Sequence, residues 1–171
     1  MKRLFLFLLL SVFGFGLFAA DNVVGLWKII DDKTNKPNSI VSLYLYGGKL
    51  YGRILATIST KTGLIDDTYL TKTSLMKKIA GDPPVCGLDF VYLMEDKGKE
   101  WVGSIIDPEP ADEYECVIKK DGDKLNVRGQ LKGLGFLGRD QKWLPVAASD
   151  IPIDMVVPDA ASFVPVIPKR K

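Results

Sequence analysis

The chain has 171 residues, with 23 Lys and Arg against 21 Asp and Glu and a formal net charge of +2. This near-neutral balance argues against a nucleic-acid partner, which requires a strongly basic surface. The sequence contains no histidine, which excludes the commonest general base and metal ligand and every Ser-His or Cys-His nucleophile pair.

Residues 1–20 have the pattern of a secretory signal peptide. Two basic residues precede an apolar run over residues 4–18, and Ala19 and Ala20 end the segment. The run is shorter than the roughly 20 residues that a membrane-spanning helix needs. We therefore expect cleavage and export, with no transmembrane segment left afterwards; an uncleaved membrane anchor is the competing interpretation. Loss of the two basic residues would leave a formally neutral mature domain of about 150 residues.

The next part of the sequence predicts three strands. VVGLWKII (23–30) is ended by a segment rich in Asp, Asn and Pro. SIVSLYLY (39–46) then alternates aliphatic side chains with Ser and Tyr side chains. LYGRILATI (50–58) follows a Gly-Gly pair. Two β-rich runs around such a pair predict a hairpin, because the tight turn between the strands needs positive φ.

Residues 59–87 are compatible with two local structures. Apolar residues such as Leu75 and Ile79 have a spacing that fits a short helix, which Gly81 would end. A long exposed loop is the alternative.

Five further strands are predicted after this region. They are GLDFVYLM (87–94), WVGSIID (101–107), EYECVIKK (113–120), KLNVRGQL (124–131) and RDQKWLPV (139–146). The eight strands are joined mostly by short turns and no helix-sized segments alternate with them, which argues against a parallel α/β sheet. Residues 21–146 therefore predict one antiparallel all-β domain, either a closed up-and-down barrel or a sandwich.

Residues 147–171 differ in composition from the domain before them. Four prolines and little periodicity predict an extended, Pro-rich C-terminal tail. Apolar residues such as Ile151 and Phe163 indicate that part of the tail lies against the domain or a partner. The basic end, PKRK, is interpreted as solvated.

The stretch GLWKIIDD (25–32) places a Gly-x-Trp motif in the first predicted strand. This motif at the head of an eight-strand meander resembles the first-strand signature of the lipocalin-type barrels. The resemblance implies that Trp27 plugs the closed end of the barrel and that an arginine near the last strand packs across it. Arg139 is the matching arginine, and Trp143 lies on the same strand. The resemblance thus assigns structural barrel closure to these three residues.

A second resemblance covers residues 24–146. The phrases GLWKIIDD, GGKLYGRI, EWVGSIIDP, DKLNVRG and LGRDQKW, in this order and spacing, are similar to the bacterial domain-of-unknown-function family 2147. The resemblance implies a small exported protein of the Gram-negative cell envelope, periplasmic or secreted, and carries no assigned activity. The sequence departs from the family pattern after IIDP, where EPADEY replaces a glycine-lysine turn. We therefore expect a lipocalin-like, antiparallel up-and-down eight-stranded barrel with a Pro-rich C-terminal extension.

The predicted strands carry enough aromatic side chains to line an apolar pocket. Eight-stranded barrels either fill with side chains or hold one small ligand, and both have the same sequence pattern. An interior Arg53 would fix a carboxylate with two hydrogen bonds, but strand parity is equally compatible with an outward position. The candidate ligand-binding residues are Tyr44, Tyr51, Arg53, Phe90, Tyr92, Trp101 and Tyr114. A packed core is the alternative.

The chain has two cysteines, Cys86 and Cys116. In an oxidising compartment, a disulfide between them would close a loop of about 30 residues and stabilise the fold by roughly 3–4 kcal/mol. Two buried free thiols are the alternative.

Four carboxylates lie within the run Asp107 to Glu113. Their oxygens could hold a hard cation such as calcium, but Asp-Pro is also a turn signal. We assign no metal, no catalytic residue and no cofactor, because the sequence has no nucleophile elbow, phosphate-binding glycine loop or metal-spaced cysteine pair.

These observations favour a binding protein over an enzyme, which would have to use Asp, Glu, Lys, Tyr or Ser alone. We expect a periplasmic barrel that binds a small apolar or amphipathic ligand or a cell-envelope component. The alternative is a non-enzymatic envelope interaction or scaffold protein with a filled barrel, which contacts an envelope protein through its tail or residues 59–87.

Overall fold

The structure, a computed structural model, describes residues 23–153 and 155–171. The predicted signal peptide, residues 1–20, lies outside the described residues. The strands are β1 (Gly25–Ile30), β2 (Pro37–Tyr46), β3 (Lys49–Ile58), β4 (Ile65–Thr68), β5 (Asp89–Asp96), β6 (Trp101–Ile106), β7 (Glu113–Asp121), β8 (Lys124–Leu131) and β9 (Leu134–Pro145). Two short 3-10 helices follow, η1 (Ala148–Asp150) and η2 (Ala160–Ser162). No helix among the described residues has the length and apolar character needed to cross a membrane.

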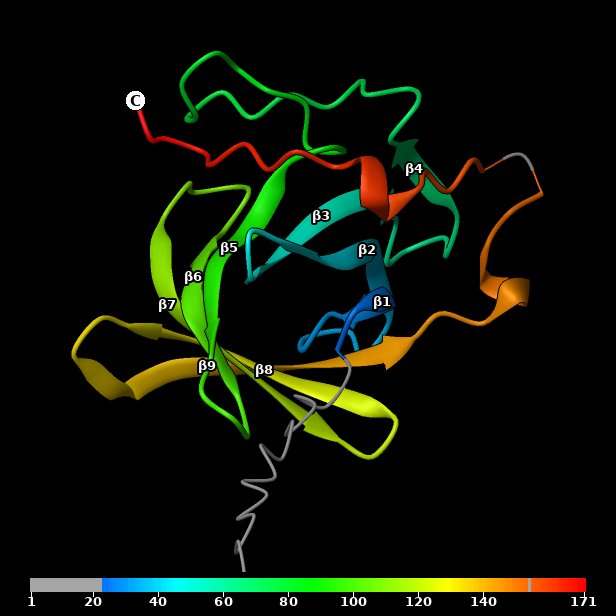
Figure 1. Ribbon diagram of the computed structural model, residues 1–171. Helices are drawn as coiled ribbons and strands as arrows, with labels where there is room; N and C mark the ends of the chain where they lie inside the picture. Colours follow the sequence, from blue (N-terminus) through cyan, green and yellow to red (C-terminus); the bar gives the residue numbers. More distant parts are fainter. Residues whose placement is uncertain (1–22, 154) are drawn as a thin grey trace, which may run out of the picture.

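Eight of the strands close into an antiparallel barrel (Figure 1). Neighbours in sequence pair throughout, except that β3 pairs with β5, and the ring closes between β1 and β9, where Ile29 lies opposite Trp143. Gly47 and Gly48 have φ values of 57° and 77° and form the predicted tight turn between β2 and β3, which residues with a Cβ atom disfavour. The predicted up-and-down barrel is confirmed, and closure removes the exposed sheet edges that a sandwich would keep.

The ninth strand was not predicted. β4 pairs with the end of β3, from Ala56 to Ile58, while the first half of β3 pairs with β5. Residues 69–88 form turns and isolated bridges in place of the helix considered from sequence. The helical spacing of apolar residues there did not produce a helix, because Asp67 and the prolines of the segment hold the backbone in turns.

Asp67 organises the start of this loop. Its carboxylate is 2% exposed and accepts hydrogen bonds from the backbone N–H of Ser74 (2.9 Å) and Thr73 (3.2 Å) and from the Thr71 hydroxyl. Burial alone would raise the pKa of Asp67, but these hydrogen bonds outweigh it and lower the pKa to about 2. The loop is therefore built around an ionised carboxylate.

Replacing Asp67 with Asn should destabilise the domain near neutral pH by about 2 kcal/mol. The folded-state pKa lies below the unfolded value, so this stabilisation is present above about pH 4 and is lost as the pH falls toward 2. Chemical denaturation at several pH values should show a smaller loss of stability on acidification for the variant than for the parent. Asp66→Asn, at the exposed neighbouring position, is the control; equal pH profiles for all three proteins would contradict this role.

One aromatic contact and one strand pairing identify the inner face of the barrel. The rings of Trp143 on β9 and Phe90 on β5 stack with their centroids 5.8 Å apart. Because β5 and β9 are not neighbours in the sheet, this contact crosses the barrel interior. Directly opposed residues of paired strands share a face, so the face of Trp143 also carries Ile29 and Trp27.

The inner face is packed with large side chains. Its members come from every strand of the ring and are at most 7% exposed; they include Trp27, Ile29, Val41, Leu43, Leu50, Ile54, Phe90, Val91, Met94, Trp101, Cys116, Ile118, Leu125, Val127 and Trp143. Glycine provides room where strands and side chains approach most closely: a Cβ on Gly103 would lie 2.7 Å from the Cα of Met94. The centre of the barrel is therefore occupied by side chains.

The tail after β9 returns to the barrel. Asp150 of η1 binds Lys28 of β1 with an Nζ–Oδ2 distance of 2.7 Å, and Phe163, after η2, is 4% exposed. Figure 1 shows the final segment, in red, crossing β3 and β5 and ending beside the green loop that precedes β5. The tail is thus extended, as predicted, and part of it lies against the domain.

Candidate functional site

A buried polar cluster lies on the outer wall of the barrel. Arg53 on β3 and Asp89 at the start of β5 form a two-pronged ion pair, with Nε–Oδ1 and Nη2–Oδ2 distances of 2.9 and 2.6 Å. Tyr44 on β2 donates its hydroxyl to the same carboxylate at 2.7 Å. The two charged residues are 7% and 1% exposed. Burial alone would lower the pKa of Arg53, but Asp89 raises it above its ordinary value, so the guanidinium stays protonated.

The tail covers this cluster and makes direct contact with it. Arg53 donates from Nη2 to the carbonyl of Val164 (2.9 Å), and Asp89 accepts the backbone N–H of Val166 (2.8 Å). The ring of Phe163 lies 4.3 Å from the guanidinium carbon of Arg53 and packs edge-on against Tyr44. Such cation–π contacts are strengthened by exclusion of water.

The barrel wall divides the predicted ligand-binding residues into two groups. Ser42 pairs with Arg53 and Tyr44 with Tyr51, alternating with the inward pairs formed by Val41 and Leu43. Tyr44, Tyr51 and Arg53 therefore face outward. The prediction that they line an interior cavity is wrong, because one-residue alternation sends them to the face that the tail covers.

The same alternation along the strands places the remaining candidate ligand-binding residues. Tyr92 lies opposite Ser104 on the outer face, where burial and a hydrogen bond with Glu113 raise its pKa. Phe90 and Trp101 face inward and belong to the packed core. Tyr114 shares the inner face with Cys116 but is only half-buried, because it lies at the end of the barrel where a groove opens.

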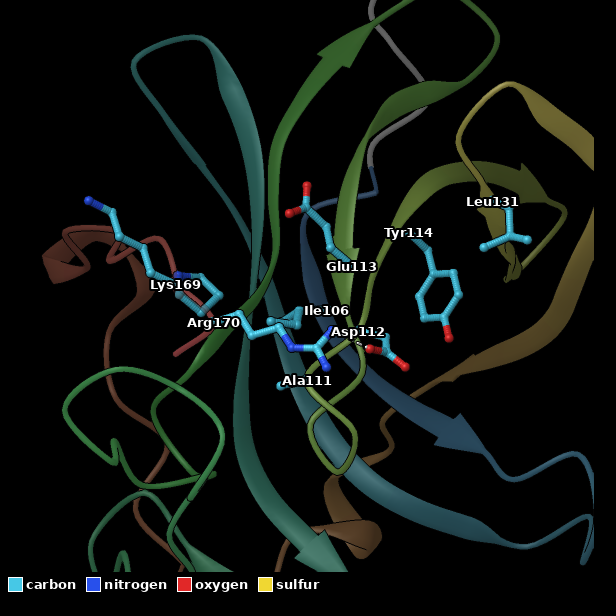
Figure 2. Close-up of a pocket in the computed structure, with 9 residues that line it drawn as sticks. Ile106, Ala111, Asp112, Glu113, Tyr114, Leu131, Lys169 and Arg170 are labelled. Atoms are coloured by element: carbon cyan, nitrogen blue, oxygen red, sulfur yellow. Dashed lines mark hydrogen bonds and ion pairs between the residues drawn. The ribbon is translucent and has the colours of Figure 1, made fainter.

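This groove has a volume of about 640 Å³ and lies where β6 ends and β7 begins (Figure 2). Its walls come from the β6–β7 connection, the end of β8 and the last residues of the tail. The lining residues are Ile106, Ala111, Asp112, Glu113, Tyr114, Leu131, Pro168, Lys169 and Arg170. The tail is therefore structurally part of the groove.

Four of the nine lining residues are charged, and two of them, Asp112 and Arg170, form an ion pair. Arg170 lies 2.8 Å from Asp112, and Figure 2 shows its guanidinium directed at that carboxylate while Lys169 extends away. Tyr114 and Leu131 lie on the other side of the pair (Figure 2). The groove thus combines an apolar wall with one exposed, exchangeable charge pair.

The acidic run considered for calcium forms a turn. Asp107 accepts the backbone N–H of Glu109 at 3.0 Å, and its own N–H donates to the carbonyl of Asp112 at 2.9 Å. Within the part of the chain that the structure describes, no three acidic or cysteine side chains gather as metal ligands would.

Barrel closure differs in detail from the prediction. Trp27 and Trp143 are buried on the inner face at the seam, and Trp27 donates from Nε1 to the carbonyl of Val23 at 2.9 Å. Trp27 lies opposite Pro145, six residues beyond Arg139 on β9. Arg139 is therefore far along the strand and pairs with Asp32, so its predicted packing across Trp27 is wrong.

The predicted disulfide is also wrong: Cys86 and Cys116 are both free and buried. Cys116 lies on the inner face between Gly103 and Gly129, whereas Cys86 lies in the loop before β5. Burial raises the pKa of Cys86 to about 12 and raises that of Cys116 further. Both thiols remain protonated and have the character of small apolar core residues.

Two residues of the outer cluster, Asp89 and Phe163, were missed as site residues. Asp89 stands at the start of the apolar run DFVYLM, and a lone acidic residue there is the only sequence signal of a buried partner for an arginine. Phe163 is one apolar residue among several in the tail, so nothing local marks it as the anchor.

Comparisons with known proteins agree with this architecture. Residues 25–144 match the sequence profile of the family described as "Uncharacterized protein conserved in bacteria (DUF2147)". No curated protein matches the sequence. Protein HP1028 from Helicobacter pylori, described as belonging to the lipocalin family, matches the structure with a TM-score of 0.59 and 13% identity, covering 74% of this chain and 84% of its own. This chain therefore belongs to the DUF2147 family and has a lipocalin-like barrel fold.

Proposed function

We propose that this protein is an exported, non-enzymatic barrel that binds a small amphipathic molecule in the groove at the β6–β7 end. The observation that carries the proposal is the groove itself, in which apolar side chains lie beside one exposed ion pair. A volume of several hundred Å³ is in the range of small-molecule sites, in which apolar side chains bind the body of the ligand and polar groups orient it. The lipocalin-like fold supports the same class of function.

The chemistry of the lining defines the ligand class. Ile106, Tyr114 and Leu131 offer contact to a hydrocarbon or ring portion. The Arg170–Asp112 pair is exposed, with side chains 62% and 44% accessible, so a polar headgroup can exchange with either partner at little cost. Because the centre of the barrel is packed with side chains, the ligand binds in the groove at the end of the barrel.

Leu131→Asp should weaken ligand binding about tenfold, because one apolar contact of roughly 1.5 kcal/mol is lost and a charge enters the apolar wall. Leu131 is 44% exposed, so the fold should persist. Binding is measured by titrating the protein with 1-anilinonaphthalene-8-sulfonate, and by native mass spectrometry of protein isolated from a bacterial envelope. Leu137→Asp, 49% exposed on β9 and outside the groove lining, is the matched control. Equal affinities for the parent and both variants would refute the groove as the site.

Export is part of this proposal and rests on residues 1–20. Their basic start, short apolar run and terminal alanines are the pattern of a cleaved signal peptide. Periplasmic or secreted protein should begin after Ala19 or Ala20, which N-terminal sequencing of the exported material tests. Material that stays in the cytoplasm with Met1 intact would contradict it.

A second candidate is an envelope interaction protein with a filled barrel. The packed inner face favours it, as do exposed apolar residues of the tail, among them Ile153 and Val156. Ile153→Asp should then reduce binding to an envelope protein, whereas Leu131→Asp should leave it unchanged. The two candidates thus predict opposite sensitivities.

A further inference from the structure

The tail is bound to the outer wall of the barrel as a peptide ligand is bound to a receptor. Phe163 inserts its ring among Tyr44, Tyr69 and Arg53 and is 4% exposed. Val164 and Val166, which follow it, are held through their backbone. Arg53 donates to the carbonyl of Val164, and Asp89 accepts the N–H of Val166. One aromatic anchor and a bidentate backbone clamp therefore fix the segment.

The clamp recognises an extended conformation more than particular side chains. Val164 and Val166 contribute backbone atoms to it, while their side chains are 63% and 70% exposed. Pro165 between them has no N–H to leave unpaired and favours extended backbone. The motif that fits is therefore an aromatic residue followed by an exposed residue, proline and a second exposed residue with a free backbone N–H.

The end of the tail adds to the recognition surface in the same manner. Ala80 donates its N–H to the carbonyl of Lys169 (2.8 Å), and Lys171 donates its own to the carbonyl of Lys78 (3.0 Å). Ile79 and Arg170 form an isolated antiparallel bridge between these contacts. This is the geometry of strand addition, in which main-chain hydrogen bonds supply affinity and side-chain pockets supply specificity.

A long connection joins the bound segment to the last strand of the barrel. The family match ends at residue 144, before the tail begins. Between Pro145 and Phe163, the residues that the structure describes contain no strand. At about 3.3 Å per extended residue, that connection can reach well beyond its own barrel.

We propose that the outer wall of β2, β3 and β5 is a peptide-binding site that the chain fills with its own residues 163–171, and that a second copy of the chain can supply the same segment. Tethering gives the internal segment a high effective concentration, so the monomer is favoured when the protein is dilute. Reciprocal exchange of the tails satisfies the same contacts in a symmetric dimer.

The first test supplies the segment in trans. A fluorescent peptide of residues 159–171 is titrated into full-length protein carrying Phe163→Ala, whose own tail lacks the anchor. We expect saturable binding at least tenfold tighter than binding to the parent protein, in which the internal tail competes. Failure of the peptide to bind a folded F163A protein, with folding checked by near-UV circular dichroism, overturns the proposal.

Changes in the peptide test the recognition without disturbing the fold. Phe163→Ala in the peptide should abolish binding, and N-methylation at Val166 should weaken it at least tenfold by removing the donor to Asp89. Val164→Ala, at a side chain 63% exposed, should leave the affinity unchanged. Equal affinity of all four peptides would show non-specific association and refute the site.

If the F163A protein does not fold, a protein cleaved between the barrel and the tail provides the test. A protease site replacing residues 156–158, of which the first two are exposed, allows cleavage after the parent protein has folded. The proposal expects the cut tail to stay bound and to exchange with added peptide. Loss of the tail immediately after cleavage, or a bound tail that does not exchange with added peptide, would overturn it. Light scattering at high concentration should detect exchanged dimers of the intact chain, which the same peptide in excess should dissociate.

Discussion

Replacing Asp89 with Ala should destabilise the barrel by about 3–5 kcal/mol, the largest electrostatic effect we expect in this protein. The substitution leaves the guanidinium of Arg53 buried without its counter-charge, and removal of one partner from a buried ion pair has this cost. Tyr44 and the N–H of Val166 lose their acceptor in the same step. Equilibrium denaturation in urea measures the change.

Two controls distinguish the effect of breaking the buried ion pair from the effect of losing any charge. Glu95→Ala removes a partner of Lys49 at a site where both side chains are well exposed, and should change the stability much less than D89A does. Replacing Arg53 and Asp89 together, as R53M with D89L, should recover much of the loss because no charge remains buried. If the D89A protein is as stable as the E95A protein, the cluster has no stabilising role.

Trp143→Ala should destabilise the protein by about 3–5 kcal/mol, the range expected for removing a large buried ring. Trp143 is 0% exposed at the β1–β9 seam and stacks on Phe90 across the interior. The cavity left behind would remove the contact between β9 and β5 across the core. Thermal and chemical unfolding both measure the loss.

Trp143→Phe is the matched variant and should cost clearly less than Trp143→Ala, because a smaller cavity is left. Phenylalanine keeps an aromatic ring against Phe90, and the indole N–H that it removes has no hydrogen-bond partner among the described residues. Removing an unsatisfied buried donor offsets part of the lost packing. Equal losses for the Phe and Ala variants would mean that ring stacking is not what stabilises the seam.

The barrel could be predicted because its signals are local and repeat along the chain. Alternating strands and the Gly47–Gly48 turn indicate consecutive antiparallel pairing, which needs no long-range information. The motif around Trp27 then suggested closure, and the pairing of Ile29 with Trp143 confirms it. β4 was missed because its residues, IDDT, include two acidic residues that disfavour strands in isolation.

Side-chain function could not be predicted in the same way. Strand parity places Arg53 and Tyr44 on one face and Val41 and Leu43 on the other, yet both faces are buried. Alternation therefore cannot say which face is inside. The contact between Phe90 and Trp143 decides it, and that contact joins residues far apart in the sequence.

The sequence by itself determined the order of the eight barrel strands, the tight turns, the absence of histidine chemistry and the extended character of the tail. These follow from backbone preferences and composition, which act within a few residues. Only the tertiary structure decided that the tail returns to cover Arg53 and Asp89, that the cysteines stay apart, and that the groove opens beside Tyr114. Each depends on which segments meet once the sheet closes, and barrel curvature, unlike strand formation, is a property of the whole chain.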